Sequence, residues 1–245
     1  STRGRANLLR AVLSGKLPSA SLTEDRLHQS LDLCLECKGC KGECPSTVDM
    51  AKLKYEYLHQ YNKANGISRR TWIFANINTL SRWGSRFAPL SNWLTKIPGI
   101  RLVMDIVLGV DSRRALPRFA SESFPAWFKT HTPSGQGESG QVVLFNDTFM
   151  NYNLPQIGKA ATYLLEKAGF RVILANTSCC GRPMISKGLL LEAKSNAISN
   201  VNSLLPYAEQ GIPIIGCEPS CILTLKDEYP DLLRTDASKL VASNS

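Results

Sequence analysis

Residues 34–45, CLECKGCKGECP, decide the fold of the first part of this chain. The spacing C-x2-C-x2-C-x3-C-P is typical of segments whose thiolates hold [4Fe–4S] clusters. Gly39 and Gly42 lack a Cβ, so the backbone there can lie against a cluster. A structural zinc site is the alternative, although zinc modules usually separate two C-x2-C pairs by a long gap. We therefore expect a [4Fe–4S] cluster bound by Cys34, Cys37, Cys40 and Cys44.

Helical patterns surround this cysteine run. Residues 2–14 have apolar side chains at helical spacing, and a second helix should start at Thr23 and deliver Cys34 near its end. Ser46, with Asp49 three residues later, is a capping-box pattern, and the helix that it opens should end at Asn65-Gly66. The first part of the chain is therefore predicted to be a compact α-helical module.

Residues 69–118 are strongly basic, with nine Lys or Arg and two Asp, in a chain of formal net charge +9. Such a segment can meet anionic lipid, nucleic acid or an acidic protein. Its Trp and aliphatic residues fit helices lying on a membrane, but helices that pack a Trp face on the core are commoner. No fingerprint of a nucleic-acid-binding module accompanies the charge, so we expect no nucleic-acid partner. Peripheral membrane contact through residues 69–118 stays open.

The pattern changes after a Pro- and Gly-containing linker at 130–137. Buried strands are predicted near 142–147, 170–175 and 212–217, alternating with helices at 155–168, 189–208 and 219–228. This β-α-β-α-β order predicts a parallel, right-handed α/β unit. We therefore expect an α+β protein, with an α-helical domain over 1–130 and an α/β domain over 131–245.

A second set of cysteines follows the last two predicted strands. Cys179-Cys180-Gly181 leaves one strand, and Cys217 and Cys221 leave the next. Because the carboxyl ends of parallel strands meet at one edge, these cysteines should converge although about 40 residues separate them. They are read as a second redox or cluster site, with buried apolar cysteines as the alternative. A thiol–disulfide enzyme is disfavoured because the C-x-x-C spacing is missing.

Several other polar side chains have ordinary explanations. His28, His59 and His131 are isolated, so we expect surface or helix histidines rather than ligands. Asp147 and Glu218 follow predicted strands, where each could contact a substrate or cap a local turn.

The composition is that of an ordinary globular protein, with 43% hydrophobic and 20% charged residues. There is neither an apolar run near 18 residues nor a signal-peptide pattern, and the eight cysteines are clustered rather than dispersed. These features argue against a secreted disulfide framework and predict thiols that serve as metal ligands in a reducing cytoplasm.

Five stretches resemble one family, namely residues 2–7, 34–54, 145–158, 178–188 and 218–230. They are similar to the C-terminal iron–sulfur region of FAD-linked D-2-hydroxy-acid dehydrogenases of the D-lactate or D-2-hydroxyglutarate type. The Cys-Cys-Gly segment with its later Cys also resembles the cysteine-rich subunit of heterodisulfide reductase and the iron–sulfur subunit of anaerobic glycerol-3-phosphate dehydrogenase. The resemblance covers nearly the whole chain.

The resemblance implies a ferredoxin-type first domain and an incomplete, Rossmann-like Cys-Cys-Gly second domain. It also implies an FAD domain ahead of residue 1, with further cysteines between, and a second Cys-Cys-Gly half after residue 245. Cys44 would then serve a second cubane. Relatives often place a Cys after the first strand, where residues 146–148, Asn-Asp-Thr, stand here.

The function expected from the resemblance is electron transfer within an FAD-dependent oxidoreductase that oxidises a D-2-hydroxy acid. Electrons would pass from the flavin through [4Fe–4S] clusters to a quinone or protein acceptor, at or near the inner face of a membrane. The alternative is a zinc-stabilised, non-redox module that docks a partner through its basic segment.

Overall fold

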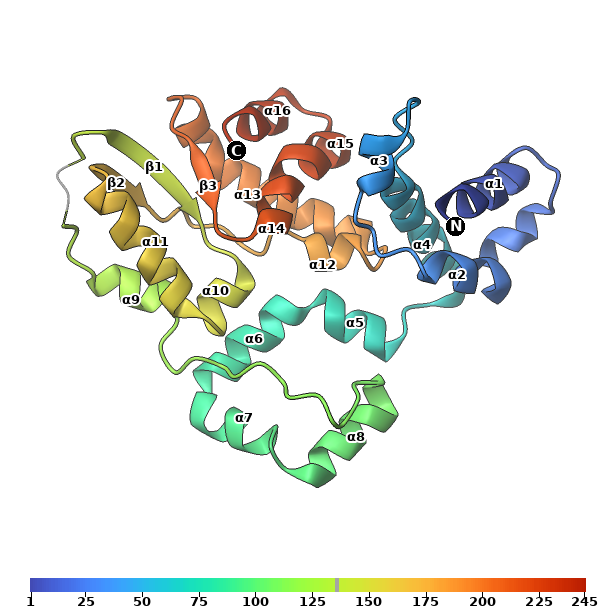
Figure 1. The fold of residues 1–245 in the computed structure, drawn as a ribbon, viewed down its shortest axis with the longest axis horizontal. Helices are drawn as coiled ribbons and strands as arrows, with labels where there is room; N and C mark the ends of the chain where they lie inside the picture. Colours follow the sequence, from blue (N-terminus) through green and yellow to red (C-terminus); the bar gives the residue numbers. More distant parts are fainter. Residues whose placement is uncertain (135–136) are drawn as a thin grey trace. The chain divides into compact units, whose positions relative to one another are not determined.

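The computed structural model describes residues 1–134 and 137–245, which form two compact units (Figure 1). The first unit comprises residues 1–75 and 183–191, and the second comprises residues 76–182 and 192–245. Helices dominate, and a small parallel sheet lies in the second unit. The α+β class expected from the sequence is therefore confirmed.

The first unit is built from short helices. They are α1 (Thr2–Leu13), the 3-10 helix η1 (Ser19–Thr23), α2 (Asp25–Asp32), α3 (Gly39–Glu43), α4 (Met50–Asn65) and α5 (Arg69–Ala75). Their apolar faces enclose one core, made of Leu9, Val12, Leu27, Leu31, Met50, Tyr57 and Leu58. The helix predicted over 2–14 is confirmed. The next helix begins at Asp25 rather than at Thr23, because η1 occupies the preceding residues.

The predicted capping box at Ser46 is wrong. Asp49 is the N-cap of α4, and its Oδ1 accepts hydrogen bonds from the backbone N–H groups of Ala51 (3.0 Å) and Lys52 (3.1 Å). A short carboxylate at the N-cap reaches these amides directly, so no hydroxyl three residues earlier is required. The predicted end of this helix is confirmed: Gly66 has φ of 81°, a region that favours glycine.

Residues 183–191 pack against α4 within the first unit. Asn62 Nδ2 donates a hydrogen bond to the Lys187 carbonyl (2.7 Å), and His59 Nδ1 lies 3.1 Å from the Gly188 carbonyl oxygen. Gly188 has φ of +72°, and a Cβ there would lie 2.6 Å from the backbone of Leu58 and His59. This close approach leaves room only for glycine.

The second unit contains three parallel strands in the order β2-β1-β3. They are β1 (Gly140–Phe145), β2 (Phe170–Ile173) and β3 (Ile214–Gly216). Val142 pairs with Val172, and Val143 pairs with Ile214. All three predicted strands and their parallel direction are therefore confirmed, with boundaries shifted by at most two residues.

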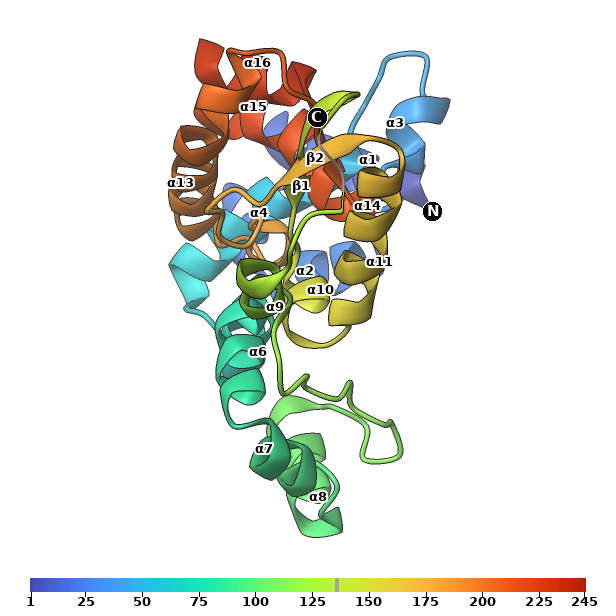
Figure 2. The same ribbon diagram turned by 90° about the vertical axis from the view of Figure 1, so that its left-hand side faces the viewer.

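The central strand β1 is covered on both faces. Figure 2 shows α11 (Pro155–Lys167) and α13 (Leu190–Ala208) on opposite sides of the sheet. Val143 and Phe145 pack in a cluster that includes Val201 of α13, whereas Leu144 packs with Phe124 and Met150. Burial on both faces explains why the strand is a continuous apolar run instead of an alternating one.

Residues 76–130 belong to the second unit, together with the sheet. They contain α6 (Ile77–Arg86), α7 (Ala88–Leu94), α8 (Pro98–Leu108) and α9 (Phe124–Thr130). Ser85 Oγ donates to the Ala120 carbonyl (2.6 Å), and Thr148 of α10 (Thr148–Tyr152) donates to Asn78 Oδ1 (3.0 Å). The two compact units divide the chain between Ala75 and Asn76, and the domain boundary expected near residue 130 stays a prediction.

Two further details differ from the sequence-based expectations. The side chains of Trp72, Ile73, Ile77, Leu80 and Trp83 have the spacing of one continuous helix, but the structure divides this stretch at Asn76 into α5 and α6. The helix expected over 219–228 consists of α14 (Pro219–Leu223) followed by a π-helical turn, η2 (Thr224–Glu228). Residues 135 and 136 of the predicted linker lie outside the described residues.

The remaining helices are α12 (Arg182–Ile185), α15 (Tyr229–Leu233) and α16 (Asp236–Ser243). Within the described part of the chain, no helix combines the length and the apolar character needed to span a membrane.

Candidate functional site

The first cysteine run forms a tightly curled loop between α2 and α4. Cys34 follows α2, Cys40 lies in α3, and Cys44 ends α3. Glu36 and Lys38 both have left-handed backbone conformations, with φ of 55° and 58°. Such residues reverse the chain locally and are uncommon outside glycine, so they mark a loop whose shape is held by its surroundings.

A buried lysine holds this loop against α4. Lys54 Nζ donates a hydrogen bond to the Cys34 carbonyl (2.7 Å) and lies 3.4 Å from Glu36 Oε1. The Lys54 and Glu36 side chains are only 8% and 5% exposed. A buried charge needs a partner, so the pair fixes the loop at Cys34 to the helix.

Three of the four predicted ligands line one hollow. A cavity of about 200 Å³ is lined by Cys34, Cys37 and Cys40 together with backbone and side chains of residues 33–38. Cys44 does not line it. The backbone N–H groups of Val48 and Ser46 lower the pKa of the Cys44 thiol, which favours the thiolate that binds metal.

The second cysteine set is brought together by the sheet, as predicted. Cys179 and Cys180 follow β2, and Cys221 lies in α14 after β3. The Sγ atoms of Cys180 and Cys221 are 3.1 Å apart, and the neighbouring Cys179 thiol is hydrogen-bonded to Cys180. Cys217, by contrast, is exposed. The structure therefore gathers three of these four cysteines.

A polar network supports the Cys179-Cys180 backbone from behind. Asn200 Nδ2 donates to the Cys179 carbonyl (3.1 Å), and the Tyr229 hydroxyl donates to the Cys180 carbonyl (3.0 Å). Asn200 Nδ2 also donates to Tyr229 (2.8 Å). All these groups are buried, so the network fixes where the two thiols point.

The thiols of Cys179 and Cys180 are held in the protonated form in the absence of a metal. The hydrogen bond to Cys180, followed by burial, raises the pKa of the Cys179 thiol. At Cys180 the bond with Cys179 favours the thiolate, but the Cys221 contact and burial outweigh it and raise the pKa. Metal binding at these sulfurs therefore has to displace protons.

Thr148 lies beside this set. Its side chain is hydrogen-bonded to the Cys179 thiol, and its hydroxyl donates to Asn78. This residue stands where the sequence lacks the cysteine expected after the first strand. The fold thus places that position next to the other thiols.

The remaining predicted site residues have structural roles. Asp147 caps α10 through the N–H groups of Phe149 (2.8 Å) and Met150 (3.0 Å), and Glu218 accepts a hydrogen bond from the Ser220 hydroxyl (2.7 Å). The capping interpretation of Asp147 and Glu218 is therefore confirmed. Burial raises the pKa of the Asp147 carboxyl.

The three histidines lie in ordinary packing environments. His28 stacks on Tyr61, with ring centroids 4.3 Å apart, and His59 contacts the Gly188 carbonyl. His131 pairs with Glu166, 2.8 Å between Nε2 and Oε1. The sequence did not predict this buried pair, because His131 was expected to be an isolated surface or helix histidine.

The donor chemistry of both cysteine sets fits iron–sulfur clusters, which are held by thiolates. Among the described residues, no three Cys, His, Asp or Glu side chains are already arranged around a single metal-ion position. At the first set, the hollow lined by Cys34, Cys37 and Cys40 provides thiols and space for a cluster. At the second set, the contact between Cys180 and Cys221 provides sulfurs that converge on one point.

Comparison with known proteins defines the class first. Residues 144–226 match the model of the cysteine-rich domain called CCG. The matched segment contains Thr148 and all four cysteines of the second set.

Individual relatives are dehydrogenases or reductase subunits. The chain is 31% identical to a subunit of the anaerobic glycerol-3-phosphate dehydrogenase of Escherichia coli (strain K12), over 78% of this chain and 49% of the relative. It is 23% identical to D-2-hydroxyglutarate dehydrogenase of Haemophilus influenzae, over 84% of this chain and 21% of the relative. It is 31% identical to a subunit of the fumarate reductase (CoM/CoB) of Methanothermobacter marburgensis, over 39% and 19%.

The resemblance predicted from the sequence is therefore confirmed. The chain spans about half of the glycerol-3-phosphate dehydrogenase subunit and about a fifth of the hydroxyglutarate dehydrogenase. No solved structure matches the chain significantly.

Proposed function

We propose that this chain is the iron–sulfur electron-transfer part of an FAD-dependent oxidoreductase that acts on a D-2-hydroxy acid and reduces a quinone or a protein acceptor. The contact between Cys180 and Cys221 carries the proposal, because it brings sulfurs from two separate strand ends to one point. When bound, iron–sulfur clusters supply one-electron redox chemistry, and the protein tunes it through burial and hydrogen bonds to sulfur.

The first domain in this proposal is ferredoxin-type. Cys34, Cys37 and Cys40 would hold one [4Fe–4S] cluster from the hollow that they line. Cys44 would serve a second cubane, in keeping with its absence from that hollow and with the amides that favour its thiolate. Lys54 keeps the loop in place.

The second domain in this proposal is a Rossmann-like half with its own centre. Cys179, Cys180 and Cys221 would supply the ligands, and the Asn200–Tyr229 network would orient them. Cys217 is the weakest candidate, because its side chain is exposed and separate. A functional boundary near residue 130 belongs to this proposal.

The FAD and the substrate rest on the relatives alone. The hydroxyglutarate dehydrogenase matches a larger share of this chain (84%), and the glycerol-3-phosphate dehydrogenase subunit has the higher identity (31%). Both relatives are longer than the matched segment, which leaves room for a flavin domain. We favour a D-2-hydroxy acid because the resemblance extends to the N-terminal stretch at residues 2–7.

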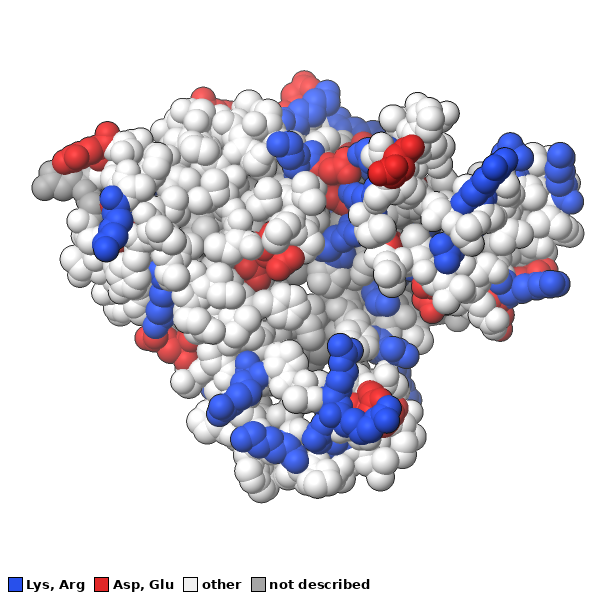
Figure 3. Space-filling view, viewed as in Figure 1, with Lys and Arg blue, Asp and Glu red and all other residues white. Residues whose placement is uncertain are grey.

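The surface of α6–α8 supports contact with a membrane from the cytoplasmic side. None of the residues of α8 is buried, and Ile106 is 76% exposed. Other large side chains exposed on this segment are Trp83, Phe87, Leu90, Trp93, Leu102 and Val103. Figure 3 shows Lys and Arg side chains gathered around this region at the bottom of the view. Exposed apolar residues within a basic surface favour an anionic bilayer.

Reduction by substrate tests the proposal. In the full-length protein, purified without oxygen, a D-2-hydroxy acid should bleach the flavin and produce an EPR signal of a reduced cluster. The Cys37→Ser variant should keep the flavin and its bleaching but lose the EPR signal of one cluster. If the variant keeps every EPR signal of the unchanged protein, or if no EPR signal ever forms, the proposal is wrong.

A further inference from the structure

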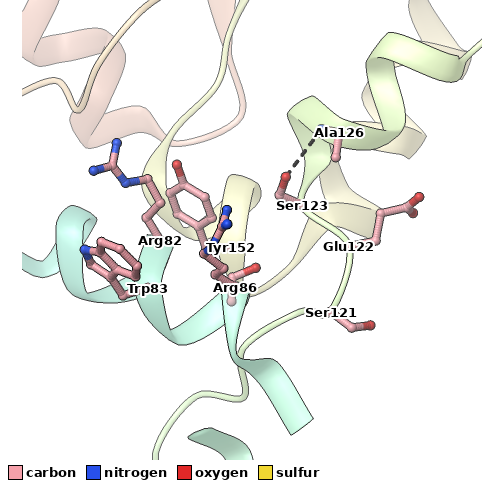
Figure 4. Close-up of a pocket in the computed structure, with 9 residues that line it drawn as sticks. Arg82, Trp83, Arg86, Ser121, Glu122, Ser123, Ala126 and Tyr152 are labelled. Atoms are coloured by element: carbon pink, nitrogen blue, oxygen red, sulfur yellow. Dashed lines mark hydrogen bonds between the residues drawn. The ribbon is translucent and has the colours of Figure 1, made fainter. Parts of the chain in front are cut away.

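The second unit contains a large cavity whose lining includes no cysteine. It has a volume of about 720 Å³ and is lined by α6, by residues 121–123 ahead of α9, and by Tyr152 at the end of α10. In Figure 4 the Tyr152 ring lies between the side chains of Arg82 and Arg86, and Ser123 faces them from the opposite wall. None of these residues takes part in the proposed electron transfer.

The cavity carries uncompensated positive charge. Arg82 and Arg86 lie one helical turn apart on α6, a spacing at which like charges repel. Within the described residues, neither guanidinium has an ion-pair or hydrogen-bond partner. The one carboxylate in the lining, Glu122, is bound to Lys159 (2.8 Å) and points away from the arginines in Figure 4.

The neutral polar groups of the cavity are hydrogen-bond donors. Burial raises the pKa of Tyr152, which keeps its hydroxyl protonated despite the opposing effect of Arg82. Ser123 Oγ accepts from the Ala126 N–H (3.3 Å), which leaves its own proton free to donate. Ser85, in contrast, is occupied by the Ala120 carbonyl.

We propose that this cavity binds a phosphate group, held by Arg82 and Arg86 with hydrogen bonds from the hydroxyls of Tyr152 and Ser123. Two guanidiniums and two hydroxyls offer more donors than the two oxygens of a carboxylate can accept, whereas a phosphate presents three or more oxygens. The cavity is larger than a phosphate, so the ligand carries an organic group. Trp83, at its edge, provides an apolar surface for that group.

The phosphate can belong to a free phosphate ester or to an anionic phospholipid headgroup. Trp83 stacks on the exposed Phe87, with ring centroids 6.1 Å apart, directly beside the arginines. This arrangement suits a headgroup whose acyl chains lie along the apolar surface. A phospholipid as the source of the phosphate rests on the proposed membrane contact, whereas a free phosphate ester does not.

Binding assays on the whole chain test the site and distinguish a free phosphate ester from a phospholipid headgroup. Inorganic phosphate is titrated by calorimetry, with citrate as the carboxylate comparison. Flotation is measured with vesicles of phosphatidylcholine alone or with phosphatidylglycerol added. The variants are Arg82→Gln, Arg86→Gln and Arg82→Lys, and Lys96→Gln is the matched control, since it removes one charge from the same surface outside the cavity.

We expect each Arg→Gln change to weaken binding by about tenfold or more, and Lys96→Gln to have little effect. Arg82→Lys should recover only part of the loss, because a lysine lacks the two-pronged guanidinium. Loss of phosphate affinity supports a free ester. Selective loss of flotation on phosphatidylglycerol, without phosphate binding, supports the lipid.

Equal effects of the Arg82, Arg86 and Lys96 variants with every probe would overturn the proposal, and citrate binding as tight as phosphate binding would overturn the phosphate assignment. A protein that binds phosphate but floats with no vesicle would contradict only the membrane contact. Cluster EPR signals should be unchanged in all variants, so failure of this site is separate from failure of the electron-transfer function.

Discussion

The Sγ atom of Cys180 lies 3.1 Å from the Sγ atom of Cys221, although the two residues are 41 positions apart in the sequence. Strands β2 and β3 both flank β1 and run parallel to it, so their carboxyl ends open at the same edge of the sheet. The segment after each strand carries one of the two cysteines: Cys180 lies in the loop after β2, and Cys221 lies in α14 after β3. This shared edge turns two distant motifs into one candidate centre.

Replacing either sulfur of this pair should remove the second centre. Cys180→Ser or Cys221→Ser should lower iron and acid-labile sulfide by the content of one cluster, because serine oxygen is a poor substitute for a thiolate. Cys217→Ser is the matched control and should retain full iron. Iron loss in the Cys217 variant equal to that in the other two would show that the exposed cysteine is also a ligand.

A thiol at position 148 should strengthen this centre. Thr148→Cys would place a fourth sulfur beside Cys179, which the Thr148 side chain already contacts. We expect more iron to be retained after gel filtration in air, whereas Thr148→Ser, which keeps the hydroxyl, should leave retention unchanged. No gain with cysteine would mean that position 148 does not face the cluster.

Lys54 should be required for the first cysteine loop. Lys54→Met would remove the hydrogen bond to Cys34 and leave the buried Glu36 carboxylate without this cation. Breaking such a buried pair costs about 3 kcal/mol of the free energy of unfolding. Lys63→Met, at an exposed position of the same helix, should be neutral. Urea denaturation of both variants measures the difference, and equal midpoints would refute the role of Lys54.

The acid sensitivity of the second unit should depend on Glu166. Burial would raise the pKa of Glu166, but hydrogen bonds from His131 and Ser134 outweigh it and lower that pKa. A carboxyl whose pKa is lowered by folding stabilises the folded state at pH values above its ordinary pKa of 4.5. This stabilisation is lost as the pH falls through the lower pKa that the group has in the folded state.

Glu166→Gln should therefore lower the free energy of unfolding by about 2 kcal/mol at pH 7 and flatten its fall below pH 4.5. Glu209→Gln, at an exposed position, is the control. Denaturation curves between about pH 3 and pH 7 decide the question. An unchanged pH profile in the Glu166 variant would contradict the assignment.

Local patterns predicted much of this fold. The apolar runs that contain Val142 and Ile214 were recognisable as strands because burial on both faces leaves no polar alternation. Parallel pairing then followed from the intervening helices, and with it the meeting of Cys180 and Cys221. The glycine at position 66 correctly marked a helix end, because its left-handed backbone conformation is costly for other residues.

Other features depend on tertiary contacts that no local pattern records. Asp49 displaced Ser46 as the helix cap because one carboxylate satisfies two amides. The hydrogen bond from Thr148 of α10 to Asn78 of α6 joins residues 70 positions apart in the sequence. The burial of Lys54 has one trace in the sequence, because Lys54 lies between Met50 and Leu58 at the i+4 spacing of a buried helix face.

Metal and sulfide analysis of the protein, purified and kept without oxygen, distinguishes an iron–sulfur protein from a zinc-stabilised one. We predict iron and acid-labile sulfide in equal amounts, in multiples of four per chain, and a cluster EPR signal on reduction. Stoichiometric zinc without sulfide would contradict the account and favour a non-redox docking module.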